Sequence, residues 1–268
     1  MTVLPAHEDR SMSSTPFEPV RSLWIGNSLP PAHHACITSF LRIGHPFELF
    51  SYDPIDNVPR GTNLRSAAEI IPRDRIFRYG PAAGRGAGSL GAFSNLFRFA
   101  LLLREGGYWV DTDMFCLRPF PADPIVISSE RRSDGRTTSC GSVLKCPAQH
   151  PLAQYCFDRA HAADPQTLIF GQTGPALVAA AVQDLSLEST VAPPDAFCSV
   201  NWFEHESLCT PGTIPETAFG VHLWGERWRQ METPIPWPGP PGSILHALST
   251  LSPSSSHDGR GERPAGPR

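Results

Sequence analysis

One segment near the middle of the chain constrains the fold more than any other. Residues 93–105 carry apolar side chains at helical spacing, and a Gly-Gly pair ends that pattern. A short apolar run at 108–110 follows, and Asp111 and Asp113 come directly after it, separated by one residue. The segment predicts a helix, a glycine turn and a strand that delivers two carboxylates at its carboxyl end.

The pattern of strand followed by helix continues on both sides of this segment. Such alternation predicts an α/β fold with a single Rossmann-like mixed, mostly parallel sheet and helices on both faces. Ser94 is expected to cap the helix 93–105, and the glycine-rich stretch 81–91 is expected to be a mobile loop. The predicted strands are 22–26, 47–52, 108–113, 125–129, 142–146 and 218–223, and the other predicted helices are 31–44, 63–70, 152–162 and 173–181.

Composition sets the outer limits of the prediction. The chain has 268 residues, of which 40% are hydrophobic and 18% charged, and its formal net charge of −4 argues against a nucleic-acid partner. The 7 cysteines show no CxxC spacing, which favours reduced thiols in a cytoplasmic protein. No stretch approaches the roughly 18 apolar residues of a membrane span. We expect a disordered leader at 1–19, one domain at 20–248 and a disordered tail at 249–268.

The pair of carboxylates suggests metal chemistry. Hard divalent cations that carry phosphate cargo are bound by one or two carboxylates, with diphosphate oxygens and water completing the coordination. Asp111 and Asp113 therefore point to a nucleotide-activated substrate. A bare D-x-D is common by chance, however, and the simplest alternative is a solvated strand end.

A longer pattern surrounds the pair. Residues 94–113 resemble the sugar-binding region of DXD-containing nucleotide-sugar glycosyltransferases, which reads S-D-x-x-R-x-x-x-L-x-x-x-G-G-x-Y-x-D-x-D. The resemblance extends over most of residues 22–228, and it implies a GT-A-like fold of the capsular polysaccharide, α-1,4-glycosyltransferase and initiating mannosyltransferase type. Three further matches carry it, namely Leu23-Trp24-Ile25-Gly26 (W-I-G-G strand), Gly174-Pro175 (T-G-P turn) and His222-Leu223-Trp224 with Trp228 (H-x-W-x-x-x-W).

The resemblance implies a role for each acidic residue. Asp113 should bind the metal directly, and Asp111 should reach the hydroxyls of the donor or the metal through water. His222 is a candidate third ligand, which would favour Mn²⁺ over Mg²⁺; the alternative is a core histidine beside Trp224. Arg98 should contact the donor sugar or diphosphate, and its alternative is a surface salt bridge with Glu105 or Glu130.

The remaining predicted donor contacts come from four segments. Trp24, Ile25 and Gly26 should cradle the nucleotide, although Trp24 could equally be a core residue. Asn95 stands where many relatives have Asp, so it keeps an acceptor oxygen but drops the charge. Trp224 and Trp228 could line the sugar site or close the core. Gln172 or Glu226 could lie under the anomeric carbon. Arg85 could belong to a lid over the diphosphate, although an ordinary disordered surface loop is the preferred interpretation.

These residues together predict a metal-dependent glycosyltransferase that moves a hexose from a UDP- or GDP-linked donor to a polysaccharide, lipid-linked or other glycan acceptor. The resemblance alone implies retention of the anomeric configuration. A lipid-linked acceptor would require peripheral association with the inner face of the membrane, and the acceptor is expected at 195–209 and 233–242. Two alternatives stay open: a metal-dependent phosphohydrolase, for which the carboxylates and histidines on successive strand ends are too few, and a non-catalytic carbohydrate- or nucleotide-sugar-binding protein on the same fold.

Overall fold

The computed structural model describes residues 17–251 and confirms the predicted α/β class. A six-stranded sheet has the order β3-β2-β1-β4-β7-β6, in which the first four strands run parallel and the last two are antiparallel to their neighbours. The carboxyl ends of β1 and β4 therefore meet at one edge. The strands are β1 Val20–Trp24, β2 Phe47–Ser51, β3 Asn63–Ser66, β4 Gly107–Val110, β6 Val126–Arg131 and β7 Thr137–Cys146.

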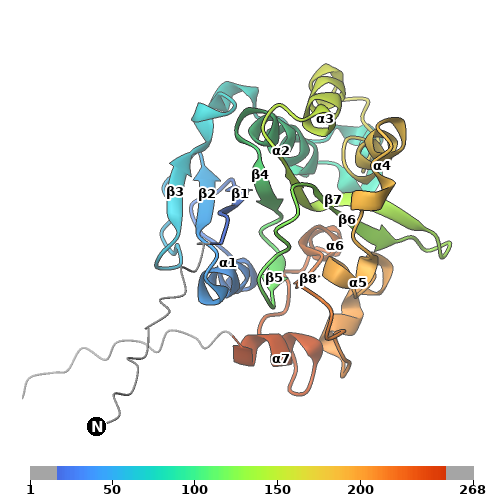
Figure 1. Ribbon diagram of the computed structural model, residues 1–268. Coiled ribbons are helices and arrows are strands. Elements are labelled where there is room, and N and C mark those ends of the chain that lie inside the picture. Colours follow the sequence, from blue (N-terminus) through green and yellow to red (C-terminus); the bar gives the residue numbers. More distant parts are fainter. Residues whose placement is uncertain (1–16, 252–268) are drawn as a thin grey trace, which may run out of the picture.

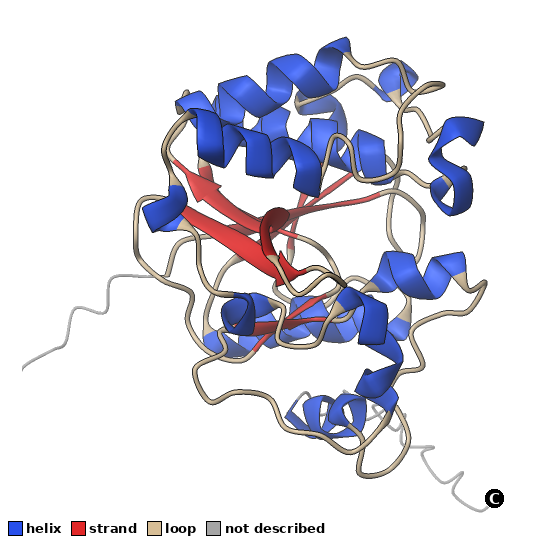
Figure 2. Cartoon of the chain, turned by 90° about the vertical axis from the view of Figure 1, so that its right-hand side faces the viewer, coloured by secondary structure: helices blue, strands red, loops and turns tan. Residues whose placement is uncertain are grey.

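Helices cover both faces of this sheet (Figures 1 and 2). One core joins α1 to the small antiparallel sheet of β5 (Met114–Cys116) and β8 (Gly220–His222). The other core joins α2, α3 and α4 to the opposite face. The helices are α1 Pro31–Ile43, α2 Gly91–Glu105, α3 Pro151–Ala162, α4 Pro175–Asp184, α5 Pro194–Phe197, α6 Gly225–Gln230 and α7 Ile244–Leu251, with 3-10 helices at Ala67–Glu69, Arg73–Arg75, Pro81–Gly86, Glu188–Thr190 and Trp202–Cys209.

The glycine turn after α2 is confirmed, and its physical cause is clear. Gly106 and Gly107 have φ of 65° and 77°, a region that side chains avoid. A Cβ on Gly106 would lie 2.3 Å from the amide nitrogen of Ala148. The prediction that Ser94 caps α2 is wrong, because α2 already begins at Gly91 and Ser94 donates its backbone N–H to Leu90 inside the first turn.

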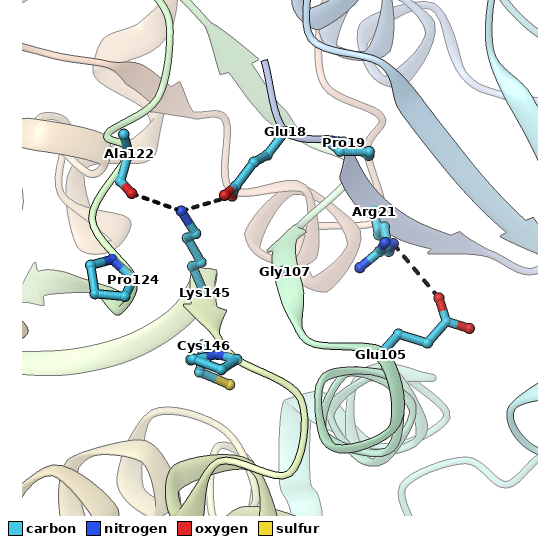
Figure 3. Close-up of a pocket in the computed structure, with 10 residues that line it drawn as sticks. Glu18, Pro19, Arg21, Glu105, Gly107, Ala122, Pro124, Lys145 and Cys146 are labelled. Carbon is cyan, nitrogen blue, oxygen red and sulfur yellow. Dashed lines mark hydrogen bonds and ion pairs between the residues drawn. The ribbon is translucent and has the colours of Figure 1, made fainter. Parts of the chain in front are cut away.

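Two described segments lie just outside the expected domain at 20–248, whose extent stays a prediction. Most of the predicted leader and tail lies outside the described residues, but Glu18 lies within them and pairs with Lys145 at 2.7 Å (Figure 3). α7 continues to Leu251, three residues beyond the expected end at 248, because Ile244, Leu245 and Leu248 hold it against the first core. None of the helices within residues 17–251 is long and apolar enough to cross a bilayer.

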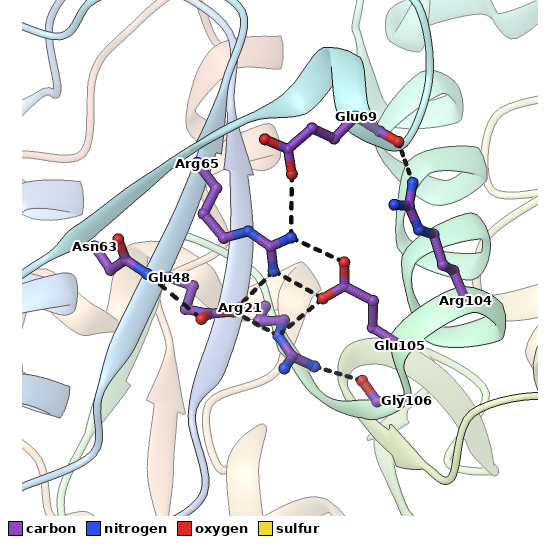
Figure 4. Close-up of polar contacts among 8 residues, drawn as sticks. All are labelled: Arg21, Glu48, Asn63, Arg65, Glu69, Arg104, Glu105 and Gly106. Carbon is purple, nitrogen blue, oxygen red and sulfur yellow. Dashed lines mark hydrogen bonds and ion pairs between the residues drawn. The ribbon is translucent and has the colours of Figure 1, made fainter.

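The prediction of a helix at 63–70 is wrong. Its first half is the edge strand β3, paired in parallel with β2, and only a short 3-10 helix follows. Arg65 on this strand reaches Glu48 on β2 and Glu105 at the end of α2, with nitrogen–oxygen distances of 3.4 Å and 2.8 Å (Figure 4). Pairing at the sheet edge and these ion pairs outweigh the local helical preference of the segment.

Two further local predictions are corrected. The strand predicted at 108–113 ends at Val110, since Asp111 already begins a turn in which its carbonyl accepts the N–H of Met114 at 3.0 Å. The glycine-rich stretch 81–91, expected as a loop, contains a 3-10 helix. This stretch is packed at Gly86, where a Cβ would lie 2.1 Å from the ring of Phe170.

Candidate functional site

The turn between β4 and β5 places the two acidic residues at the carboxyl edge of the sheet. The N–H of Asp111 donates to the carbonyl of Ser142 on β7 at 2.9 Å, which fixes the start of the turn. The carbonyl of Asp113 accepts the N–H of Leu223 at 2.9 Å, where β5 pairs with β8. This pairing brings His222, distant in sequence, to the side of Asp113.

Asp111, Asp113 and His222 form a compact triad. Each offers one ligand atom, and the three atoms lie within 4.8 Å of one another. Within residues 17–251, His222 Nδ1 is buried without a hydrogen-bond partner, while its Nε2 lies 3.3 Å from Asp113 Oδ2. Two carboxylate oxygens and one imidazole nitrogen are a donor set that fits Mn²⁺, so these residues fit the predicted cation.

The charges of Asp113 and His222 each favour the ionised form of the other. Burial opposes ionisation of Asp113, but His222, His33 and the Gly225 N–H together hold the pKa of its carboxyl well below the usual range. Burial also opposes the charged form of His222, yet Asp113 and Asp111 raise the pKa of this imidazole to about 9. The pair is therefore an aspartate beside an imidazolium at neutral pH, and a cation that takes an imidazole nitrogen would displace a proton.

Arg98 holds Asp111 from the side of α2. Its side chain is only 5% exposed, its Nη2 donates to Asp111 Oδ1 at 2.5 Å, and its Nη1 donates to Asn95 Oδ1 at 2.9 Å. Trp109 Nε1 donates to the same Asp111 oxygen at 2.9 Å. The alternative of a surface salt bridge with Glu105 or Glu130 is wrong, because the guanidinium is buried against Asp111.

Gly141 on β7 makes room for this guanidinium. A Cβ at Gly141 would lie 2.2 Å from Arg98 Nη1, closer than any side chain tolerates. No sequence motif indicates this requirement, because Gly141 contacts Arg98 only through the pairing of β7 in the sheet. Gly141 thus controls the position of Arg98 without touching the triad.

The triad also has its own backbone support on the opposite side. Trp224 has a left-handed conformation with φ of 58°, and the chain turns so that Gly225 donates its N–H to Asp113 Oδ2 at 2.6 Å. One oxygen of each aspartate is therefore fixed by the protein, at Asp111 Oδ1 and Asp113 Oδ2. Within the described residues, the other oxygen of each makes no hydrogen bond, which leaves it free to bind a ligand.

The predicted nucleotide-binding strand lies next to this turn. Trp24 ends β1, donates its indole N–H to the carbonyl of Ser28 at 3.1 Å, and stays partly exposed. Gly26 has φ of 143°, and Ile25 packs on the second core. The structure thus brings Trp24, Ile25 and Gly26 to the same edge of the sheet as the triad, where their role as a nucleotide cradle stays a prediction.

His33 connects that strand to the DXD turn and was missed by the sequence reasoning. It lies in the first turn of α1, its Nδ1 is 2.9 Å from Thr112 Oγ1, and its ring centroid is 4.9 Å from that of Trp24. Burial lowers the pKa of His33, against the opposing effects of Asp113 and Thr112. A histidine one turn into a helix carries no recognisable motif, so only the fold identifies it.

Glu130 is a second group that the sequence did not select for the site. Burial raises the pKa of its carboxyl to about 8, with contributions from Cys140 and Asp111 in the same direction, while His222 acts against the shift. Glu130 therefore carries a proton for much of the neutral pH range.

Other predicted residues lie around the triad in different roles. Asn95 Nδ2 would lie 3.0 Å from a Cβ on Gly174, so the T-G-P turn packs directly on α2 at this amide. Gln172 Oε1 accepts the N–H of Ile169 at 3.1 Å, and among residues 17–251 no hydrogen bond joins it to the triad. A place for Gln172 under the anomeric carbon stays a prediction.

The tryptophans of the C-terminal motif are core residues. Trp224 is 7% exposed, its ring centroid lies 4.0 Å from that of His222, and its N–H donates to the carbonyl of Val200 at 2.9 Å. Trp228 is equally buried and donates to the carbonyl of Leu223 at 3.0 Å. The structure therefore favours the alternative in which both rings support the site from the core.

Glu226 links α6 to the glycine-rich loop. It accepts the hydroxyl of Ser89 at 3.0 Å and pairs with Arg229, whose Nη2 also reaches the carbonyl of Arg85 at 3.3 Å. These contacts hold the loop against α6. The glycine-rich loop is thus held at this edge by Glu226 and Arg229, and Arg85 takes part through its backbone.

Comparison with known proteins identifies the central segment. Residues 89–132 match the model of the family described as "Glycosyltransferase sugar-binding region containing DXD motif". This match confirms the resemblance inferred from residues 94–113. No curated protein matches the chain.

Several solved structures are distantly similar to this chain. The PaToxG glycosyltransferase is 14% identical, with 65% of this chain and 72% of that chain covered and a TM-score of 0.45. The bacterial N-acetylglucosamine transferase NleB is 10% identical, with 59% and 84% covered and a TM-score of 0.36. The catalytic domain of alpha-toxin from Clostridium novyi is 8% identical, with 88% and 77% covered and a TM-score of 0.35.

Proposed function

Since the chain carries a DXD-type glycosyltransferase sugar-binding region, we propose that it is a metal-dependent, retaining hexosyltransferase. The donor is a UDP- or GDP-linked sugar, and the acceptor is a glycan, either free or lipid-linked. The observation that carries this proposal is the triad of Asp111, Asp113 and His222, whose ligand atoms converge within 4.8 Å inside and beside the matched segment. The family resemblance alone supports the retaining outcome.

The residues of the triad would hold Mn²⁺ or Mg²⁺, which supplies positive charge opposite the diphosphate leaving group. Asp113 is suited to direct coordination, because Gly225 fixes one of its oxygens and leaves the other free. Asp111 is suited to the hydroxyls of the donor, since Arg98 and Trp109 orient it. The family resemblance supports this division of roles, since each aspartate keeps one oxygen without a hydrogen bond among the described residues.

Arg98 contributes a second source of positive charge. Its guanidinium is buried, and its Nε has no hydrogen-bond partner within residues 17–251. A desolvated guanidinium in fixed geometry stabilises negative charge more than a solvated one does, because it needs no reorganisation during the reaction. Arg98 would therefore orient Asp111 and favour departure of the diphosphate.

Release of nucleoside diphosphate tests the proposal. The purified chain is incubated with UDP- and GDP-sugars in the presence of Mn²⁺, with and without EDTA. We expect slow release from at least one donor, loss of release with EDTA and its return with added Mn²⁺. Binding of a nucleotide sugar without any release would instead indicate a non-catalytic binding protein, and the anomeric configuration of a product, read by NMR, would test retention.

A further inference from the structure

A cavity of about 260 Å³ lies directly beside the triad, between the start of α1 and the segment that follows α6. Asp111 and Asp113 do not line it, and most of its lining residues belong to none of the family motifs. The residues that matter for its chemistry are Pro30, His33, Gly225, Thr233, Pro234 and Ile235, with Arg229 and Glu232 also in its wall.

The wall of this cavity contacts the DXD turn at two points. Gly225 lines the cavity and donates its N–H to Asp113 Oδ2 at 2.6 Å. His33 lines it as well, with its Nδ1 2.9 Å from Thr112 Oγ1. A molecule in the cavity would therefore lie next to whatever the triad holds.

The charges of the wall disfavour a diphosphate. Arg229 lines the cavity, but its guanidinium is paired with both carboxylate oxygens of Glu226 at 2.7 and 2.8 Å. Glu232 adds an exposed carboxylate, which repels phosphate. The buried cation of the site, Arg98, lies against Asp111 instead. An uncharged molecule suits this wall better than the charged part of the donor.

The remaining lining matches a sugar. Pro30, Pro234 and Ile235 offer apolar surface to C–H groups, whereas the Thr233 hydroxyl and the Glu232 carboxylate can bind hydroxyl groups. We propose that this cavity binds the acceptor sugar of the reaction. The inference rests on the proposed function, and the competing occupant is the nucleoside of the donor.

Two substitutions in the cavity wall distinguish an acceptor sugar from the nucleoside of the donor. Ile235→Trp fills the cavity from its buried side, and Glu232→Ala removes an exposed carboxylate with little risk to folding. Ala122→Trp is the matched control, because Ala122 is exposed in the wall of a different cavity, of about 350 Å³, beside Lys145 (Figure 3). Each protein is tested for binding of a panel of methyl glycosides by ligand-observed NMR, and for donor hydrolysis without acceptor.

We expect at least one methyl glycoside to bind the wild type and the control. Binding should weaken about tenfold or more in Ile235→Trp and several-fold in Glu232→Ala, with donor hydrolysis within about twofold of wild type. Loss of donor hydrolysis in a folded variant, unchanged glycoside binding in both variants, or no glycoside binding to the wild type would each overturn the inference. If Ile235→Trp fails to fold, Glu232→Ala decides. Absence of donor hydrolysis in the wild type would contradict the proposed function. Glycoside binding is a separate measurement, so the two failures can be distinguished.

Discussion

Two charged clusters in this molecule are buried to a similar degree but differ in how completely their charged groups are paired. In the network across β1, β2 and β3, Arg21 and Arg65 pair with Glu48 and Glu105 at 2.7–3.9 Å, and their side chains are 15–24% exposed (Figure 4). In the triad, the side chains are 9–25% exposed, but each aspartate keeps one oxygen without a hydrogen bond among the described residues.

The difference shows that burial alone does not distinguish a structural cluster from a binding site. The network is satisfied internally, so its charges stabilise the sheet edge and need no ligand. The triad brings two carboxylates together and leaves part of their binding capacity unused, which costs stability and favours a cation. Four predictions test this contrast, in order of decreasing effect.

Asp113→Asn should have the largest effect. The substitution keeps the shape but removes the charge that a divalent cation needs, so donor hydrolysis with Mn²⁺ should fall roughly 10³-fold, or ~4 kcal/mol in transition-state stabilisation. The matched control is Asp134→Asn in the exposed β6–β7 turn, which should keep wild-type activity. Activity of Asp113→Asn within tenfold of wild type, with the protein folded by circular dichroism, would place the cation elsewhere.

Gly141→Ala should reduce activity by roughly 10²-fold, because the added Cβ displaces the Arg98 guanidinium from Asp111. Arg98→Lys should produce a similar loss, since the single nitrogen of an ammonium lacks the planar fork whose two nitrogens donate to Asn95 and Asp111. The double variant should be no worse than the more damaging single variant, since both act on one contact. Additive losses in kcat/KM would show that Gly141 acts independently of Arg98.

Glu130→Gln should change how stability depends on pH. The folded-state pKa of Glu130 is raised from 4.5 to about 8, so the folded protein binds the extra proton and its stability falls as pH rises through that window. Relative to wild type, the variant should gain roughly 3 kcal/mol in unfolding free energy between pH 5 and pH 8. Urea titrations at both pH values measure this, with the exposed Glu188→Gln as control. If the unfolding free energies of Glu130→Gln and wild type change with pH in parallel, the raised pKa of Glu130 is contradicted.

Arg65→Met should have the smallest effect, and only on stability. Its partly exposed ion pairs with Glu48 and Glu105 are worth about 1 kcal/mol in unfolding free energy, while donor hydrolysis should stay unchanged. Arg73→Met removes a more exposed pair with Asp53 and should cost less. A loss of activity in a stable Arg65→Met protein would show that the network affects the triad. It would contradict a purely structural role of the network.

Local sequence patterns predicted much of the fold. Helical periodicity identified α2, and the glycine pair identified its end, because both signals act over a few residues. The segment 63–70 was predicted wrongly, since its strand depends on pairing with β2 and on partners for Arg65 that are distant in sequence. Ser94 failed as a cap because α2 begins at Gly91, two residues before the apolar pattern starts at residue 93.

The residues of the site also fall into those that local sequence patterns identified and those that only tertiary contacts identify. Asp111, Asp113 and Arg98 were recognised because they share one continuous helix–turn–strand pattern, and His222 because it belongs to a second motif. His33, Gly141 and Gly225 were not, since each acts through one contact with a residue far along the chain. No local pattern encodes such contacts.

By itself, the sequence determined that two carboxylates would stand at the end of a buried strand after a glycine turn, because short-range periodicity and backbone sterics dictate that arrangement. Only the tertiary structure decided which of their oxygens are free. The parallel pairing of β1 with β4 and the antiparallel pairing of β5 with β8 bring α1 and α6 against the DXD turn. The hydrogen bonds from Arg98 and Gly225 then fix one oxygen of each aspartate and leave the other for a ligand.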